Sequence, residues 1–354
     1  MTFPHHFVSL DVKTHADHFA QAIAQGLTAA EKTLPLKYLY ATNARDSRLF
    51  ERLTRSDRCY MTQAEDTLLT RFAPRIVQQL KDNTALVNLG SQHDKQTRSM
   101  SESLSRKQGR LQFAPIDIAG DFLSHSIQLL QHDYPDLGLL GVIADYPAGL
   151  KVLNHTLTQP RLLLWLGSDI SHVEYAEAAR LLRENMVAEL KPGDRLLLGI
   201  DLKKPEEVLH AAYGRTDRDS AVRKVSLAFA RHALRRINRE LQADFAPENF
   251  DYYCHYNPVR GCMQIYLRST CPQQAHIASL GVHVGFARDE YILIHESYKY
   301  SLEDIRTLVD ATGLKLEQQW VDNDALYSLN LLMVDGSESP SEADNADSLT
   351  PAAQ

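Results

Sequence analysis

The sequence has few cysteines, no excess of basic residues and no long apolar run. Only four of its 354 residues are cysteine, none in a C-x-x-C pair, and their spacing fits neither a zinc site nor a disulfide framework. Asp and Glu number 45 against 38 Lys and Arg, which argues against a surface that neutralises nucleic-acid phosphates. No stretch approaches the roughly 20 apolar residues of a membrane-spanning helix, and the N-terminus lacks the features of a secretory signal. These absences predict a reduced, cytoplasmic protein that has no metal site and binds neither nucleic acid nor membrane.

Hydropathy divides the chain into four parts. Residues 1–64 form a mostly helical segment that we expect to pack with the second of two domains, and these domains span residues 65–200 and 201–334. Hydrophobic residues make up 44% of the chain and charged residues 23%, which suffices for cores of this size. Residues 335–354 carry almost no large apolar side chain, so they predict a disordered tail.

Short apolar runs alternate with amphipathic segments through residues 65–200. The runs read TALVNLG, LQFAPID, LGLLGVIAD, RLLLWLG and DRLLLGID, and each ends in Gly or Asp. Continuous apolar runs suit parallel strands that helices cover on both faces. This pattern predicts a doubly wound, Rossmann-like α/β domain.

The pattern changes after residue 201. Two helical stretches are followed by the runs DYYCHYN, CMQIYLRST, ASLGVHVGF and YILIHES, which are typical of an antiparallel sheet. A helix over residues 301–311 and a strand over residues 326–334 follow. We therefore expect a second, α+β domain that includes the final strand.

Small and acidic residues close the predicted parallel strands, where an open α/β sheet binds its ligand. They are Gly90, Asp117, Asp145, Gly167 and Asp201. A nucleoside cofactor with a sulfonium suits this set. Gly90 would let the backbone lie close to the adenosine, Asp117 would bind the ribose hydroxyls, and Asp145–Tyr146 would contact the adenine amine. Each Asp could instead cap the helix that follows its strand. The dinucleotide fingerprint G-x-G-x-x-G is absent, so a nicotinamide enzyme is the weaker hypothesis.

Ten motifs, in order, give the sequence a resemblance to a known family. They are LPLKYLY with RLFERLTR, CYMTQAE, LVNLGSQHDKQT, FAPIDI, ADY, LLLWLGSDISH, LKPGDRLLLGIDLKK, AAYGR, INRELQADF and ESYKY. Across residues 15–334 the chain resembles the ergothioneine-pathway histidine Nα-methyltransferases and the fungal enzymes that methylate a prenylated tryptophan. The resemblance implies a class I methyltransferase sheet that binds S-adenosylmethionine.

The resemblance also implies a site. It assigns S-adenosylmethionine binding to Tyr40, Gly90, Asp117, Asp145 and Tyr146, and an amino-acid pocket to Tyr60, Tyr213 and Ser297. In catalysis, Tyr60 and Tyr213 would accept hydrogen bonds from the amine and point its lone pair at the methyl group. Without the resemblance, aromatic core packing explains these tyrosines equally well.

Two glutamines depart from the family pattern in the cofactor loop. The family has E-L-G-S-G followed by a Lys-Thr pair, whereas this chain has NLGSQ over residues 88–92 and then Gln96 before Thr97. A second glycine lets the backbone approach the cofactor, and the side chain of Gln92 would obstruct that approach. Gln92 and Gln96 therefore predict weakened affinity for S-adenosylmethionine.

The amino-acid pocket departs as well. His172 replaces a family Asn, Asp169 a Thr, and Ile265 a Met, while His295 replaces the Glu that binds imidazole. Losing a buried, charge-assisted partner costs about 1.5–3 kcal/mol, so histidine is not the predicted substrate. Glu296 cannot compensate, because successive strand residues face opposite ways. The changes fit a pocket retuned to an acidic or differently shaped amine, a pocket no longer under selection or, with less support, a two-histidine metal site.

The sequence supports two functions. The leading hypothesis is an S-adenosylmethionine-dependent N-methyltransferase that acts on the amine of an amino acid or related small molecule other than histidine. The alternative is a non-catalytic protein of the same fold that serves as a metabolite-binding or partner subunit. The altered residues favour the alternative, and they are Gln92, Gln96, His172 and His295. The retained residues favour the enzyme, and they are Asp117, Asp145, Tyr60 and Tyr213.

Overall fold

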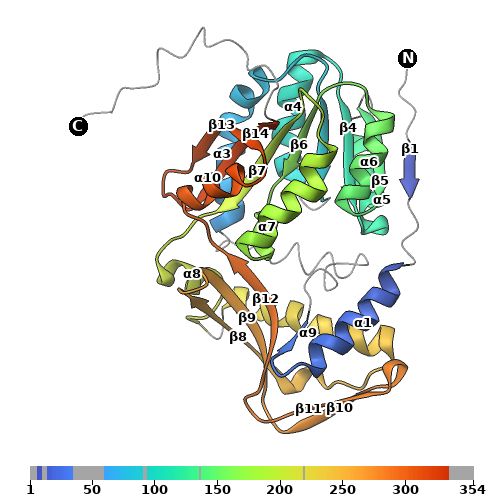
Figure 1. The fold of residues 1–354 in the computed structure, drawn as a ribbon, viewed down its shortest axis with the longest axis vertical. Helices are drawn as coiled ribbons and strands as arrows, with labels where there is room; N and C mark the ends of the chain where they lie inside the picture. Colours follow the sequence, from blue (N-terminus) through green and yellow to red (C-terminus); the bar gives the residue numbers. More distant parts are fainter. Residues whose placement is uncertain are drawn as a thin grey trace, which may run out of the picture.

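Two sheets organise the chain in the computed structural model (Figure 1). The structure describes residues 6–9, 14–34, 60–90, 94–134, 137–217 and 220–334. Tyr40, Gln92 and the predicted disordered tail lie outside these ranges. Within them, no helix is both long and apolar enough to cross a membrane.

The larger sheet has eight strands. Across the sheet these are β1 (His6–Ser9), β5 (Gly138–Ile143), β4 (Gln112–Asp117), β3 (Ala85–Leu89), β6 (Arg161–Trp165), β7 (Arg195–Asp201), β14 (Tyr327–Val334) and β13 (Leu314–Val321). The ladders from β1 to β7 are parallel, and β14 runs antiparallel to both of its neighbours. Every residue of β3, β6 and β7 is buried, which explains their continuous apolar runs.

Helices cover both faces of this sheet, as the sequence predicts for a doubly wound α/β fold. Buried side chains of three helices pack on one face: α3 (Tyr60–Gln78), α4 (Asp94–Gln108) and α5 (Gly120–Asp133). Those of three others pack on the opposite face: α6 (Tyr146–Thr156), α7 (Tyr175–Leu181) and α10 (Leu302–Asp310). Helix α10 begins with a capping box in which Ser301 and Asp304 satisfy each other's backbone N–H groups.

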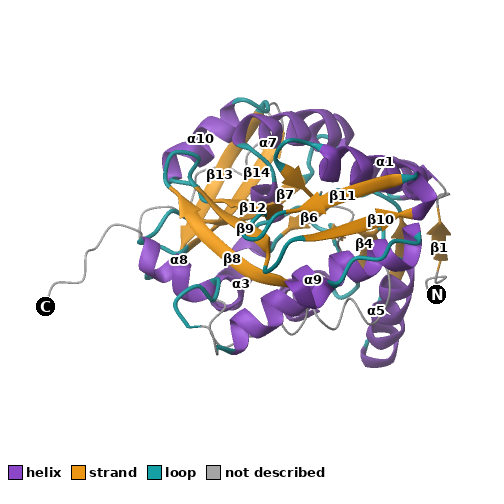
Figure 2. Cartoon of the chain, turned by 90° about the horizontal axis from the view of Figure 1, so that it is seen from below, coloured by secondary structure: helices purple, strands orange, loops and turns teal. Residues whose placement is uncertain are grey.

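The second sheet lies below the first. Its strands are β2 (Lys32–Thr33), β12 (Tyr291–Tyr298), β9 (Cys262–Ser269) and β8 (Phe250–Asn257), in that order. Figure 2, seen from below, shows β8 and β9 with helix α9 (Ala221–Leu241) alongside and the hairpin of β10 (Gln273–Ile277) and β11 (Val282–Phe286) near α1 (Thr14–Thr28). Phe19, Ile23 and Leu27 of α1 join the core of this part. Helix α8 (Glu206–Ala212) connects the two sheets along the chain.

The final strand corrects the predicted boundary between the domains. The sequence assigns residues 326–334 to the second domain, but β14 pairs with β7 in the larger sheet, with Tyr327 opposite Asp201. Seven of the eight residues of β14 are buried, which suits an interior strand covered on both faces. Helix α3 also crosses the predicted boundary at residue 64 and packs on the larger sheet. Proximity in sequence to the antiparallel strands was therefore the wrong guide for this segment.

Candidate functional site

Gly90 ends β3 in a conformation that requires glycine. Its φ is +90°, a region that side chains rarely adopt. A Cβ at this position would lie 3.3 Å from the hydroxyl of Tyr146, at the start of α6. The Gly90 backbone N–H donates to the carbonyl of Ile116 in β4 at 2.9 Å, which fixes the turn against the next strand. Gly90 and Tyr146, both predicted cofactor residues, thus form one cradle at the carboxyl edge of the sheet.

The two predicted cofactor carboxylates sit in different settings. Asp117 is buried at the end of β4, and its Oδ1 accepts the Ala119 N–H at 2.7 Å. Asp145 is exposed and caps α6, because its Oδ1 accepts the Ala148 N–H at 2.9 Å. One oxygen of Asp145 therefore has the helix-capping role that is the alternative to cofactor binding for such residues. Capping and cofactor binding are compatible, since a carboxylate has two oxygens.

Asp169 adds a third carboxylate beside this cradle. It begins the short helix η2 (Asp169–His172), after Ser168 in a left-handed conformation with φ of +58°. Burial and the charge of Asp117 raise the pKa of Asp169 to about 7, although a hydrogen bond with Tyr146 opposes the shift. Asp169 consequently interacts with both Asp117 and Tyr146.

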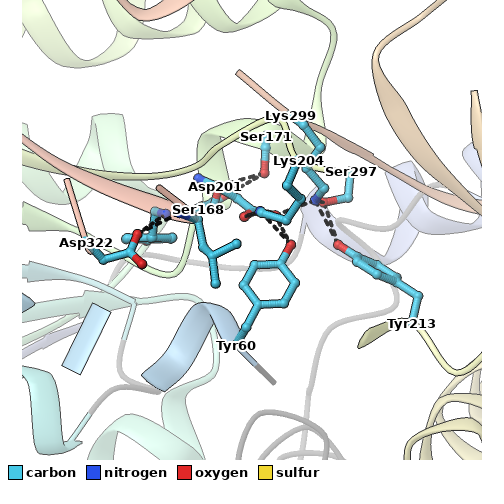
Figure 3. A network of polar contacts seen from close by, with 11 residues as sticks. Tyr60, Ser168, Ser171, Asp201, Lys204, Tyr213, Ser297, Lys299 and Asp322 are labelled. Atoms are coloured by element: carbon cyan, nitrogen blue, oxygen red, sulfur yellow. Dashed lines mark hydrogen bonds and ion pairs between the residues drawn. The ribbon is translucent and has the colours of Figure 1, made fainter. Parts of the chain in front are cut away.

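Tyr60 belongs to a buried network that was not predicted (Figure 3). Its hydroxyl donates to Asp201 Oδ2 at 2.8 Å and accepts a hydrogen bond from Lys204 Nζ at 2.9 Å. Lys204 also pairs with Asp201 Oδ1. Asp201 closes β7, Lys204 follows it, and Tyr60 begins α3, so two segments about 140 residues apart in the chain meet here.

A second branch of the network holds Tyr213 and Ser297. The Tyr213 hydroxyl donates to Ser297 Oγ at 3.0 Å, and Lys299 Nζ donates to that hydroxyl at 2.9 Å and to Ser297 Oγ at 2.6 Å. Lys299 Nζ also lies 2.7 Å from Asp201 Oδ2, which joins the two branches. The structure thus links Tyr60, Tyr213 and Ser297, three predicted pocket residues, through one carboxylate.

Charge balance explains the protonation of this network. Burial alone would raise the pKa of Asp201, but Lys299 and Lys204 outweigh it and hold that pKa below its usual range. Burial alone would lower the pKa of Lys299, but the carboxylate of Asp201 raises it above the usual range. Burial lowers the pKa of Lys204 to about 8, and Asp201 offsets only part of that shift. Asp201 therefore stays ionised, Lys299 stays charged, and Lys204 is the member that can change state near neutral pH.

His172 of η2 and His295 of β12 are in contact. Their ring centroids lie 4.7 Å apart with the rings at 83°. Burial, followed by the charge of Lys299, lowers the pKa of His172 to about 4. Burial, followed by His172 and Lys299, lowers the pKa of His295 well below its usual range. The Nδ1 atom of His295 is buried and has no hydrogen-bond partner among the residues that the structure describes. Both imidazoles are therefore neutral at physiological pH.

The neighbours of His295 on the sheet follow the predicted alternation. Ile265 of β9 is buried and lies directly opposite His295. Glu296 faces the other way, where it accepts from Gln264 Nε2 at 2.6 Å and pairs with Arg260 at 2.9 Å. Glu296 consequently does not replace a carboxylate at position 295.

Most predicted site residues lie in two groups. Gly90, Asp117, Asp145 and Tyr146 line the carboxyl edge of the larger sheet, and Tyr60, His172, Tyr213, Ile265, His295 and Ser297 lie where the two sheets meet. Tyr40 and Gln92 fall outside the described residues, as does the side chain of Gln96. Sequence reasoning marked Asp201 only as a strand end and missed Lys204 and Lys299, although both stand in the motifs GIDLKK and ESYKY. In the part of the chain that the structure describes, no cluster of three or more His, Cys, Asp or Glu could hold a metal ion.

Fold and site together define a class I methyltransferase architecture, and comparison with known proteins gives the family. The model for histidine-specific, S-adenosylmethionine-dependent methyltransferases matches residues 19–334, so the chain belongs to this family. It is 32% identical over 320 residues to a histidine N-alpha-methyltransferase of Mycolicibacterium smegmatis, covering 89% of this chain and 96% of that protein. An L-tryptophan methyltransferase of Psilocybe serbica is 24% identical over 339 residues, covering 88% and 92%. The predicted family, fold class and dependence on S-adenosylmethionine are confirmed.

Proposed function

We propose that this protein transfers a methyl group from S-adenosylmethionine to the amine of an amino acid, or a related small molecule, other than histidine. The observation that carries the proposal is the pair of neutral imidazoles, His172 and His295, in the predicted amino-acid pocket. Family membership supports the methyl transfer. The pocket supports the choice of substrate.

Histidine is a poor match for this pocket. An imidazole substrate is held best by a carboxylate, and His295 supplies a neutral ring where the family places Glu. Lys299 adds a positive potential that disfavours a cationic side chain beside both rings. Loss of a charge-assisted partner costs about 1.5–3 kcal/mol, which corresponds to roughly 10- to 150-fold in affinity. Substrates whose side chain is neutral or acidic avoid this penalty.

The residues at the sheet edge fit the cofactor. When bound, S-adenosylmethionine supplies an electrophilic methyl group on a sulfonium. The cradle of Gly90 and Tyr146 leaves room that a Cβ would fill, and Asp117 offers a buried carboxylate at the next strand end. These residues, with Asp145, are the ones we expect to hold the nucleoside.

The tyrosines are oriented to receive an amine. The Tyr60 proton is directed to Asp201 and the Tyr213 proton to Ser297, so each hydroxyl acts as an acceptor toward an N–H group. Two acceptors fixed by a buried network restrain the rotation of the amine and direct its lone pair. Alignment of donor and acceptor is the main contribution that a protein makes to an in-line displacement.

A methylation assay tests the proposal. Purified protein, S-adenosylmethionine and a panel of amino acids and related amines would be followed by mass spectrometry, with histidine in the panel. We expect turnover of a neutral or acidic member and little turnover of histidine. Histidine as the best substrate would contradict the choice of substrate. Absence of any methylated amine, despite measured cofactor binding, would contradict the activity and favour the non-catalytic alternative.

A variant tests directly whether position 295 determines the affinity for histidine. His295→Glu restores a carboxylate to the pocket, so we expect histidine to bind at least tenfold more tightly by calorimetry. His125→Glu on α5 is the matched control, because His125 is exposed and far along the chain from the pocket. Equal gains in the two variants would show that net charge, rather than the position of the carboxylate, is responsible.

A further inference from the structure

Lys204 and its neighbour Lys203 are placed very differently. The Lys204 side chain is 2% exposed, lies over the Tyr60 ring with Nζ 4.0 Å from the centroid, and bonds to the Tyr60 hydroxyl. The Lys203 side chain is 43% exposed and pairs with Asp304 at 2.7 Å. Lys204 therefore belongs to the buried network, whereas Lys203 is a surface residue.

Two ammonium groups share one hydrogen-bonded carboxylate in the network. Lys299 is fully buried and donates to Tyr213, Ser297 and Asp201, which accounts for all three of its protons. Asp201 carries a single negative charge and is shared with Lys204 (Figure 3). With both lysines charged, the two ion pairs to Asp201 therefore carry one more positive than negative charge, which Asp322 offsets only from a distance.

Each N-methylation of an ammonium substrate releases one proton, which a base must accept. A substrate ammonium has no lone pair, so it must lose one proton before nitrogen can attack. The new N–C bond then forms as the S–C bond breaks, and the S–C electron pair stays on sulfur. The product is again an ammonium, so the balance is one proton released per methyl group. Tyr60, the predicted contact of the amine, is hydrogen-bonded to both Asp201 and Lys204, and Asp201 is held ionised by its lysines.

We propose that Lys204, acting through Tyr60, takes up the proton that the substrate ammonium loses. This inference rests on the proposed function. In the observed arrangement, with Lys204 charged, the Tyr60 hydroxyl donates to Asp201; once Nζ is neutral, its lone pair can accept that proton instead. The substrate ammonium then gives a proton to the Tyr60 oxygen as the hydroxyl proton passes to Nζ. Lys204 is then an ammonium paired with Asp201, and the hydrogen bond runs from Nζ to the Tyr60 oxygen, as observed at 2.9 Å. The proton leaves to water after the product departs. Lys204 is thus a positioning residue for Tyr60 that also stores a proton.

The surroundings of Lys204 set the pH range. The charged and titratable groups that face it are Asp201 of β7, Tyr60 of α3, Lys299 after β12, and Asp322 after β13. Burial and Lys299 lower the pKa of Lys204 to about 8, while Asp201 and Asp322 act in the opposite direction. The neutral, proton-accepting form therefore becomes the major one above about pH 8.

The test is the pH profile of kcat at saturating substrate and cofactor in Lys204→Arg. Arginine keeps the charge but does not deprotonate in proteins. For the unaltered protein we expect kcat to rise with pH and level off above about 8. In Lys204→Arg we expect kcat at pH 7.5 to fall at least tenfold, the rise to move to higher pH, and KM to stay within twofold. Lys203→Arg is the matched control and should keep the original profile.

Each outcome decides between the proposals. If the unaltered protein methylates no amine, the proposed function fails. If it does methylate and Lys204→Arg keeps the original profile, only the proton relay fails. Should Lys204→Arg not fold, the unaltered protein still decides, because a kcat that falls as pH rises through 8 would show that charged Lys204 is the active form and would overturn the relay.

Discussion

Replacing Asp201 with asparagine is expected to destabilise the fold by about 3–5 kcal/mol at pH 7. Asp201 is fully buried and is the carboxylate that balances Lys204 and Lys299. Asparagine keeps the shape, so packing is unchanged, but it leaves two ammonium groups without an opposite charge. Removal of one partner from a buried ion pair typically costs this amount, a large part of the roughly 5–15 kcal/mol that stabilises a native protein.

The pH dependence of Asp201→Asn follows from the lysines. Without the carboxylate, burial and mutual repulsion lower the pKa of Lys204 and that of Lys299, while both keep ordinary values in the unfolded chain. The unfolded state then binds more protons over the range between these values, so stability rises with pH there. The variant should therefore recover part of its lost stability at pH 10, relative to the unaltered protein.

Urea unfolding followed by circular dichroism at pH 7 and pH 10 measures both effects. Glu184→Gln serves as the control, because the ion pairs of Glu184 with described residues, Arg180 and Arg183, are exposed, so their loss should cost at most about 1 kcal/mol. A loss below 1 kcal/mol in Asp201→Asn at pH 7, or a larger loss at pH 10 than at pH 7, would refute the charge balance described for this network.

Two further predictions concern the cofactor and the amine. Gly90→Ala places a Cβ on a backbone with φ of +90° and 3.3 Å from the Tyr146 hydroxyl, so S-adenosylmethionine should bind at least fivefold more weakly by calorimetry; unchanged binding would exclude the cradle as part of the cofactor site. Tyr213→Phe removes the hydroxyl that meets Ser297 and Lys299 but keeps the ring, so kcat should fall at least tenfold while circular dichroism shows an intact fold; unchanged kinetics would remove Tyr213 from the mechanism.

Much of the fold could be predicted because burial on both faces leaves a visible mark in the sequence. Strands β3, β6 and β7 are buried along their whole length and appear as continuous apolar runs. The sequence YSLNLLMV of β14 carries the same mark, yet its place beside β7 depends on a pairing between distant segments. Composition identifies an interior strand, but it does not identify the partner.

The site also combines residues that the sequence locates with residues that only the packed structure reveals. Strand-end reasoning located Gly90 and Asp117, because parallel strands bring their carboxyl ends to one edge. Lys204 and Lys299 could not be located this way, since a lysine is exposed in most settings and nothing local marks a buried one. The contact between His172 and His295 depends on η2 meeting β12, and their neutrality depends on burial and, to a lesser extent, on the charge of Lys299. Such properties arise only when separate elements pack together.

The position of β14 also determines when the larger sheet can be completed during protein synthesis. Residues 327–334 are the last of the described strands to be made, yet they lie in the interior, between β7 and β13. A nascent chain that has not reached Tyr327 leaves one edge of the Leu-rich strand β7 without its neighbour. Edges of this kind pair readily with other chains. The larger sheet is therefore completed only after the last described strand has been made, and until then β7 presents an edge to which another chain can pair.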